Sequence, residues 1–550
     1  MAHGKPYEFT SLLLCWILCF IMMPSNNAYD GLETRKGRIY GRQTEHSIEY
    51  LGIQYATANR WQPPMDLASE LFSNRSLEAT SFGPCCPQRD TGIYIPKQDE
   101  QCLYLNIFTP FKISHESLLP VLVWVHGGGL ISGCSTQSIP LLYNGTNIIR
   151  HSLQQPVIIV TINYRLGIFA EMYLTELIEE NFEWPTAGNY NYLDILSALR
   201  WINRNIHDYG GDPNNILLFG ESSGGRTVVD MGALKGSSNL YHHIISQSGA
   251  LATSLFYSNM SFALQKSNEI VEQLNCSSHE SASFLTCLRN TDINDLLMVY
   301  GNRPLKSVID GYFFSYYPSL AIQCGTYNQN INMIMGANKY EEPYYPIYPD
   351  MNSEFAIFII TEVLGRNRAP TVINYFELNN CSSSVNDTNR CCDITRFIIN
   401  AFISCGFHRV YNNIYLKYDR EDHNLFWYNM DCNSGICPKL SKEEGAGLCL
   451  HASELPFVFG TESDYRSMNP INCTWDNQTR IYSNKIISHW TNMAAYGKPL
   501  ELWKKYHPST PKFLQLTPYH EFSMESWNND CTIFDKIEQD DLFEMFGSDI

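Results

Sequence analysis

A serine stands between two glycines at the end of an apolar run, in the stretch NILLFGESSGG from Asn215 to Gly225. A strand, then Gly-x-Ser-x-Gly, then a helix is the sequence form of a nucleophile elbow, in which a strained turn exposes a reactive hydroxyl. Glycine suits positions 220 and 224 because side chains there would collide with the strand and the helix. The motif makes Ser222 a candidate nucleophile for acyl transfer, and an ordinary turn serine is the alternative that the motif alone leaves open.

Three glycines after another apolar run supply a second part of the same chemistry. The stretch VHGGG runs from Val125 to Gly129. Acyl transfer places negative charge on the former carbonyl oxygen, and glycine N–H groups approach such an oxygen without a side chain in the way. The glycines are therefore candidates for an oxyanion hole, although a plain turn is the favoured interpretation when the run is taken alone.

These residues need strands and helices to hold them. Short apolar runs that end in glycine or a polar residue predict buried strands, and these lie at Val121–Gly129, Pro156–Tyr164, Asn215–Gly220 and Ile331–Gly336. The segment Asn191–Gly210 has leucine and isoleucine at helical spacing and stops on glycine, which predicts a helix. This alternation predicts an α/β fold with a large, mostly parallel twisted sheet and helices on both faces.

Composition and targeting signals narrow the class of protein. Of 550 residues, 38 are Lys or Arg and 56 are Asp or Glu, and the net charge of −18 argues against nucleic acid as a partner. Lys5, the apolar run Ser11–Met23 and a small residue at Ala28 predict a secretory signal peptide over residues 1–28, with an amino-terminal core helix as the alternative. We therefore expect a secreted, extracellular protein whose mature chain has no membrane span, because no later apolar run is long enough.

Nothing in the sequence divides the rest of the chain. Residues 29–550 are predicted to form a single domain with long insertions, and the loosest stretches, Asn379–Cys392 and Asp431–Gly447, are expected to be surface insertions. We expect neither a cofactor nor a metal. Asn-x-Ser/Thr sequons accord with export and predict a glycoprotein; they include Asn74, Asn144, Asn259, Asn386 and Asn477.

Longer blocks of the sequence resemble the type-B carboxylesterase and cholinesterase family of α/β-hydrolases. These blocks are YGGDPNNILLFGESSGG from Tyr209, QCLYLNIFTP from Gln101 and HASELPFVFG from His451. The matches occur in the family's order from about Gly37 to Cys531. The resemblance implies the α/β-hydrolase fold and hydrolysis of carboxylic esters.

Carried over position by position, the resemblance implies a Ser-His-Glu triad. Ser222 falls on the nucleophile, His451 on the general base and Glu341 on the acid, and this chain order is the one that α/β-hydrolases use. Glu342 is the neighbouring alternative for the acid, and Glu221 is left outside the triad. The implied oxyanion donors are the N–H groups of Gly128, Gly129 and Ser223; at Ser223 the family usually has alanine.

The resemblance also implies part of a disulfide framework among the 18 cysteines. Cys86 with Cys102 and Cys276 with Cys287 match family bridges, although the adjacent Cys85 makes the first assignment ambiguous. Cys531 resembles the family's last bridged cysteine, with Cys391 or Cys392 as its expected partner. Three further cysteines suggest a local bridge set, and their spacing only weakly suggests zinc; they are Cys432, Cys437 and Cys449.

The first of these loops bears on the substrate. Cholinesterases hold choline against a tryptophan between the first bridged cysteines, by cation–π attraction. The loop Pro87–Gln101 has no tryptophan, although Tyr344 after the predicted acid is aromatic. We therefore predict a general carboxylic ester hydrolase with a small-molecule ester as its partner. A choline-ester hydrolase is the first alternative, and a neuroligin-like adhesion protein is the alternative from another class.

Overall fold

The structure is a computed structural model. It describes residues 31–111, 118–138, 141–152, 154–181, 183–249, 254–276, 281–301, 305–328, 330–341, 347–418, 423–432, 449–464, 471–472, 474–518, 520–527 and 529–546. The predicted signal peptide lies outside the described residues, as do most of the insertion Asp431–Gly447 and the residues Glu342, Tyr344 and Cys437.

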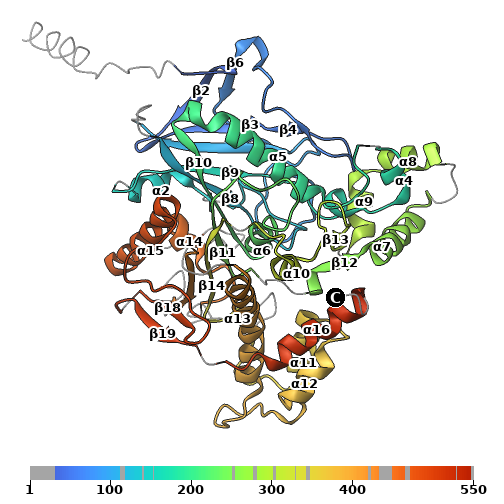
Figure 1. Cartoon of the computed structure of the whole chain (residues 1–550), viewed down its shortest axis with the longest axis vertical. Helices are drawn as coiled ribbons and strands as arrows, with labels where there is room; N and C mark the ends of the chain where they lie inside the picture. Colours follow the sequence, from blue (N-terminus) through green and yellow to red (C-terminus); the bar gives the residue numbers. More distant parts are fainter. Residues whose placement is uncertain are drawn as a thin grey trace, which may run out of the picture.

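Within the described chain, a 13-stranded sheet runs through the molecule (Figure 1). Its strands are β1 (Leu32–Thr34), β2 (Gly37–Gln43), β3 (Ser47–Gln54), β6 (Ser76–Ala79), β7 (Tyr104–Pro110), β8 (Leu119–Val125), β9 (Ile158–Ile162), β10 (Gly211–Glu221), β11 (His243–Gln247), β14 (Asn332–Asn338), β15 (Leu425–Met430), β18 (Lys512–Leu516) and β19 (Ser523–Ser526). The order is β1-β2-β3-β7-β9-β8-β10-β11-β14-β15-β18-β19, and β6 pairs with β2. Neighbours from β9 to β18 are parallel, whereas β1-β2-β3-β7-β9 and β18-β19 pair antiparallel.

The remaining elements are helices and short strand pairs. The helices are α2 (Gly145–His151), α3 (Ile168–Glu171), α4 (Thr175–Glu179), α5 (Tyr190–Asn205), α6 (Ser223–Asp230), α7 (Met260–Gln273), α8 (Ser281–Asn290), α9 (Ile293–Tyr300), α10 (Pro318–Cys324), α11 (Ser353–Leu364), α12 (Ala369–Tyr375), α13 (Cys391–Lys417), α14 (Leu455–Phe459), α15 (Asn477–Tyr496) and α16 (Thr532–Phe546). Short 3₁₀ turns are η1 (Ser73–Arg75), η2 (Ile206–Tyr209), η3 (Ser254–Phe256) and η4 (Leu378–Asn380). The strand pairs are β4 (Ala56–Thr57) with β5 (Met65–Asp66), β12 (Tyr257–Asn259) with β13 (Ser307–Ile309), and β16 (Ser463–Asp464) with β17 (Ile471–Asn472).

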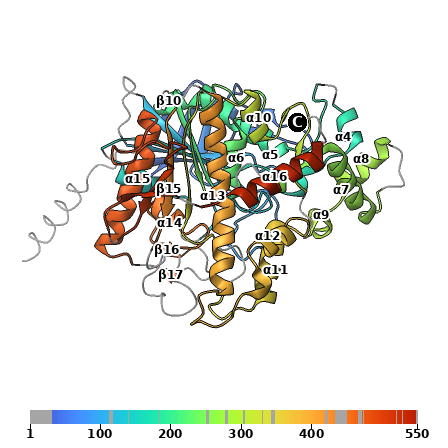
Figure 2. The ribbon, with the colours of Figure 1, turned by 60° about the horizontal axis from the view of Figure 1, so that its bottom comes forward.

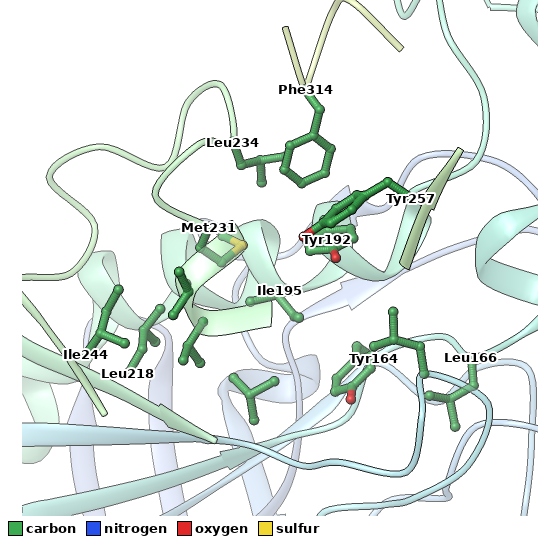
Figure 3. Packing of buried hydrophobic residues seen from close by; sticks show 14 of the residues in the cluster. Tyr164, Leu166, Tyr192, Ile195, Leu218, Met231, Leu234, Ile244, Tyr257 and Phe314 are labelled. Carbon is green, nitrogen blue, oxygen red and sulfur yellow. The ribbon is translucent and has the colours of Figure 1, made fainter. Parts of the chain in front are cut away.

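Alternation along the strands divides the core into two layers. On β10, Leu217 and Phe219 belong to one buried cluster, and Ile216 and Leu218 belong to the other. Successive strand side chains point to opposite faces, so each face packs its own set of helices. Figure 2 shows α14 and α15 on one side of the sheet and α5, α6 and α13 on the other. Figure 3 shows part of the cluster that contains Leu218.

The predicted elements are present, with shifted ends. The strand expected over Val121–Gly129 is β8, which stops at Val125 because the glycines turn away from the sheet. The helix expected up to Gly210 ends its α-helical part at Asn205 and continues as η2, a tighter turn that is common at helix ends. The α/β-hydrolase fold is confirmed. No described helix is long and apolar enough to cross a membrane.

Disulfides tie the loops around the sheet. Cys86 is bonded to Cys102 and Cys276 to Cys287, the two pairs that the family resemblance implies. Cys85 is bonded to Cys134, in the loop that follows the glycine run. Cys432 is bonded to Cys449.

The expected partner of Cys531 was wrong. Cys531 is bonded to Cys405, not to Cys391 or Cys392. Cys391 is bonded to Cys381, and Cys392 is a free buried thiol. Cys391 and Cys392 begin α13. Cys405 lies 14 and 13 residues further along that helix, which is roughly 20 Å at 1.5 Å per residue. A disulfide requires Cα atoms within about 7 Å. Cys391 and Cys392, at the start of α13, are therefore too far from the position where Cys405 bonds to Cys531.

Candidate active site

The candidate residues gather where the central parallel strands end. Ser222 follows β10, Ser248 follows β11 and Glu341 comes three residues after β14. His451 lies in the segment between β15 and α14. Carboxyl ends of parallel strands meet at one edge of a sheet, and α/β proteins bind their ligands there. Side chains that are more than 100 positions apart in sequence are thereby brought together.

Ser222 occupies a strained turn between β10 and α6. Its backbone has φ 57° and ψ −125°, a conformation that L-residues rarely adopt. Its N–H donates to the carbonyl of Gln247 on β11, at 2.8 Å. A Cβ at Gly224 would lie 2.2 Å from the carbonyl oxygen of Val125, so the close approach of α6 to β8 requires glycine at that position. These features are those of a nucleophile elbow.

A carboxylate and an imidazole form a close pair beside this turn. Nδ1 of His451 lies 2.6 Å from Oε2 of Glu341. The Glu341 side chain is fully buried, whereas the His451 side chain is 31% exposed. The acid of the pair is therefore desolvated, whereas the ring remains partly accessible to solvent.

Polar neighbours hold the Glu341 carboxylate in place. Its Oε1 accepts from Oγ of Ser248 at 2.6 Å and from the backbone N–H of Asn338 at 2.5 Å. Its own N–H donates at 2.8 Å to Oδ1 of Asn400 on α13. A carboxylate with these partners keeps a single orientation toward His451.

Two more buried carboxyl groups surround the imidazole. Nε2 of His451 lies 3.1 Å from Oε1 of Glu221, the residue before Ser222. Glu454 is also buried, and its carboxylate accepts from Nδ2 of Asn338 at 2.5 Å and from Nε2 of Gln247 at 3.3 Å. Among the hydrogen bonds of the described residues, none joins His451 to the hydroxyl of Ser222.

These carboxylates change the protonation of the ring. Burial by itself lowers the pKa of His451, but Glu221, Glu341 and Glu454 outweigh burial and raise the net pKa above its ordinary value. Burial raises the pKa of the Glu221 carboxyl as well. The site therefore stabilises a positively charged imidazole, the species that a histidine base becomes when it takes a proton.

The glycine run forms a separate loop next to Ser222, and a Cβ at Gly127 would lie 3.1 Å from Cβ of Ser222. Gly128 has φ +104°, and a Cβ there would lie 2.2 Å from the carbonyl oxygen of Ser132. Ser132 N–H donates to the carbonyl of Gly128 at 3.0 Å, which closes the turn. This loop lies next to the start of α6, where the N–H of Leu130 donates to Oγ of Ser223 at 3.1 Å.

Sequence reasoning missed several supporting residues. Ser248 and Gln247 lie in the block ISQSGA, and Glu454 lies in HASELPFVFG, so these motifs contained the signal. Asn400 comes from the middle of α13 and lies in no motif. No group of three or more His, Cys, Asp or Glu side chains within the described ranges is arranged to hold a metal ion.

The chain belongs to the carboxylesterase family. The family model described as "Carboxylesterase family" matches residues 30–534. Carboxylesterase 1C of Mus musculus is 32% identical over 366 residues, and the match covers 60% of this chain and 60% of that protein. The chain thus spans about three fifths of the length of that relative, and Carboxylesterase 1C of Rattus norvegicus is covered to 57%.

Other relatives match over more of their length. Acetylcholinesterase 4 of Caenorhabditis briggsae is 27% identical over 556 residues, covering 90% of this chain and 86% of that protein. Among solved structures, a PNB esterase has a TM-score of 0.69 at 25% identity, and a thermophilic PNB esterase has 0.70 at 25%. Each of these two structures is covered to 99% and covers 92% of this chain. The predicted family is therefore confirmed.

Proposed function

We propose that this protein is a serine hydrolase that cleaves carboxylic esters through an acyl-enzyme. Ser222 attacks the ester carbonyl, and His451 takes the serine proton and returns it to the departing alcohol. Glu341 fixes the imidazole tautomer and stabilises its charged form. Water activated by the same histidine then releases the acid. Family membership supports the predicted carboxylic ester hydrolase.

The observation that carries this proposal is the 2.6 Å pair of His451 Nδ1 and Glu341 Oε2 beside a strained Ser222. With Nδ1 donating to the carboxylate, Nε2 is the nitrogen left to act as the base. It faces Glu221, whose chain neighbour is Ser222. In the reacting complex Nε2 exchanges Glu221 for the hydroxyl of Ser222, because substrate-free hydrolases often align such bonds only when substrate is bound.

The oxyanion of the tetrahedral intermediate is stabilised by the N–H groups of Gly128, Gly129 and Ser223. Two of these donors lie on the loop after β8 and one lies in the first turn of α6. The positive end of a helix adds to the attraction for a developing negative charge. No cofactor takes part in this scheme.

We further propose a neutral ester as substrate and an exported protein of one domain over residues 29–550. The loop Pro87–Gln101 lacks the tryptophan that a choline site needs. Six disulfides among the described residues support an oxidising compartment and hence the predicted signal peptide. The family match over residues 30–534 supports the single domain.

The test compares wild type with Ser222→Ala. Wild type should release p-nitrophenol from short-chain esters and should be labelled at Ser222 by a fluorophosphonate, as read by mass spectrometry of the peptide. Ser222→Ala should lose both. Equal hydrolysis by the two proteins would end the enzyme proposal and favour an adhesion protein. A panel of acetyl, butyryl, long-chain and choline esters then decides the substrate class, and a preference for choline esters would replace the neutral-ester proposal.

A further inference from the structure

The proposed oxyanion donors come from two separate elements. Gly128 and Gly129 lie on the loop after β8, whereas Ser223 begins α6. Donors stabilise an oxyanion when they converge on one point about 2.7–3.1 Å away, so the spacing of the two elements sets the strength of the hole. A bond between the loop and α6 would fix that spacing.

Such a bond is present. The backbone N–H of Leu130 donates to Oγ of Ser223 at 3.1 Å, across 93 positions of sequence. Both partners are buried, with Leu130 2% and Ser223 8% exposed. Leu130 directly follows Gly129, so the hydroxyl holds the peptide group next to a proposed donor. The residue that supplies this hydroxyl also supplies the third donor through its own N–H.

The loop needs this support because its backbone is unfavourable. Leu130 has φ +62°, a left-handed conformation that is unfavourable for a residue with a side chain. The carbonyl of Leu130 accepts from Gly167 N–H at 2.8 Å. Leu130 is therefore held at both its N–H and its carbonyl, and Ser223 makes the bond to the element that carries Ser222.

We propose that the Ser223 side chain is a positioning residue that locks the oxyanion loop to the nucleophile helix. The inference rests on the proposed function, and it explains a departure from the family resemblance, which leads us to expect alanine at this position. With alanine, the buried N–H of Leu130 loses its acceptor, and a buried donor without a partner destabilises the conformation that it occupies. The carbonyl of Leu130 then keeps its bond to Gly167, but the loop has lost its bond to α6 and leaves the left-handed conformation at Leu130 more easily.

The experiment uses the full chain and the variant Ser223→Ala. Hydrogen exchange measured by mass spectrometry on peptides over 124–133 should become faster in the variant. For p-nitrophenyl esters, kcat should fall roughly 10- to 100-fold, since a single donor is worth about 10²–10³-fold, while KM stays within about threefold. Ser237→Ala is the matched control, because the hydroxyl of Ser237 is also buried and bonds to the carbonyls of Met231 and Leu234. Its exchange over 124–133 and its kinetics should match wild type.

A trifluoromethyl ketone separates positioning from general loss of structure. Ser222 Oγ adds to the ketone carbon, its proton passes to His451, and the former carbonyl oxygen becomes an oxyanion in the hole. Inhibition by this ketone should weaken in Ser223→Ala in proportion to kcat/KM, whereas inhibition by the product acid should not change.

Three results would overturn the proposal. Unchanged exchange over 124–133 would show that the bond does not hold the loop. Faster exchange with unchanged kcat would show that the bond has no role in positioning. A wild-type chain that hydrolyses no ester and is not labelled at Ser222 would overturn the proposed function and the catalytic role of Ser223 together, and the exchange data would still report whether the bond exists.

Discussion

Nε2 of His451 lies 3.1 Å from Oε1 of Glu221, the residue that directly precedes the candidate nucleophile. The other ring nitrogen is bonded to Glu341. The imidazole is thus placed between two carboxylates, one on each nitrogen. The bond to Glu341 keeps the ring oriented, and the nitrogen that faces Glu221 is the one that acts as base in the proposed mechanism.

We expect Glu221→Gln to shift the pH dependence of hydrolysis. The negative charge of Glu221 raises the pKa of His451, so its removal lowers that pKa. The base must be unprotonated to act, and the acid limb of kcat/KM should therefore move to lower pH. Glu179→Gln removes the same charge from the exposed face of α4 and should leave the limb in place. If the acid limb of kcat/KM in Glu221→Gln stays fixed or moves to higher pH, the electrostatic pairing of Glu221 with His451 is contradicted.

The acid of the triad is distinguished from its neighbour by paired variants. Glu341→Gln keeps the size of the side chain but cannot stabilise the imidazolium, and kcat should fall roughly 10³- to 10⁴-fold. Glu342→Gln should stay within about threefold of wild type. Turnover of p-nitrophenyl acetate measures both. If the large loss followed the change at 342 instead, the triad assignment would be wrong by one residue.

Ser248→Ala should lower kcat roughly tenfold with little change in KM. Its Oγ donates to Oε1 of Glu341 at 2.6 Å, and loss of an outer partner of this kind commonly costs 10- to 100-fold in activity at metal sites, where it has been measured. Ser483→Ala removes a comparable buried hydroxyl, bonded to the carbonyl of Phe457, and should be kinetically silent. Steady-state kinetics at the pH optimum check this, and equal kcat in the two variants would refute a supporting role for Ser248.

The sequence predicted those parts of the site that depend on local rules. The apolar runs identified the strands, and the glycines at 220 and 224 identified the elbow, because steric exclusion acts within a few residues. Asn400 and the Cys405–Cys531 bond could not be predicted in this way. Both depend on which face of the 27-residue helix α13 meets its neighbours, and that face is set by packing between distant segments.

Removal of the Cys85–Cys134 bond should lower stability measurably. The bond closes a loop of 49 positions, for which chain entropy gives about 4 kcal/mol, with 2–4 kcal/mol typical of measured cases. The double variant Cys85→Ala, Cys134→Ala should unfold at lower urea concentration and lower temperature than wild type. Cys324→Ala removes an exposed free thiol and should unfold like wild type. Identical urea midpoints for the double variant and wild type would show that the bond adds nothing.

Cys85 and Cys86 are adjacent in the chain, yet one is bonded to Cys134 and the other to Cys102. During synthesis Cys102 leaves the ribosome before Cys134, so Cys85 meets Cys102 while its own partner is still absent. A chain oxidised in that order must exchange thiols before the Cys85–Cys134 bond can form, and such reshuffling takes minutes to hours without an isomerase. Maturation of this protein should therefore depend on an oxidative folding catalyst, and recovery of activity after full reduction should be faster when protein disulfide isomerase is added.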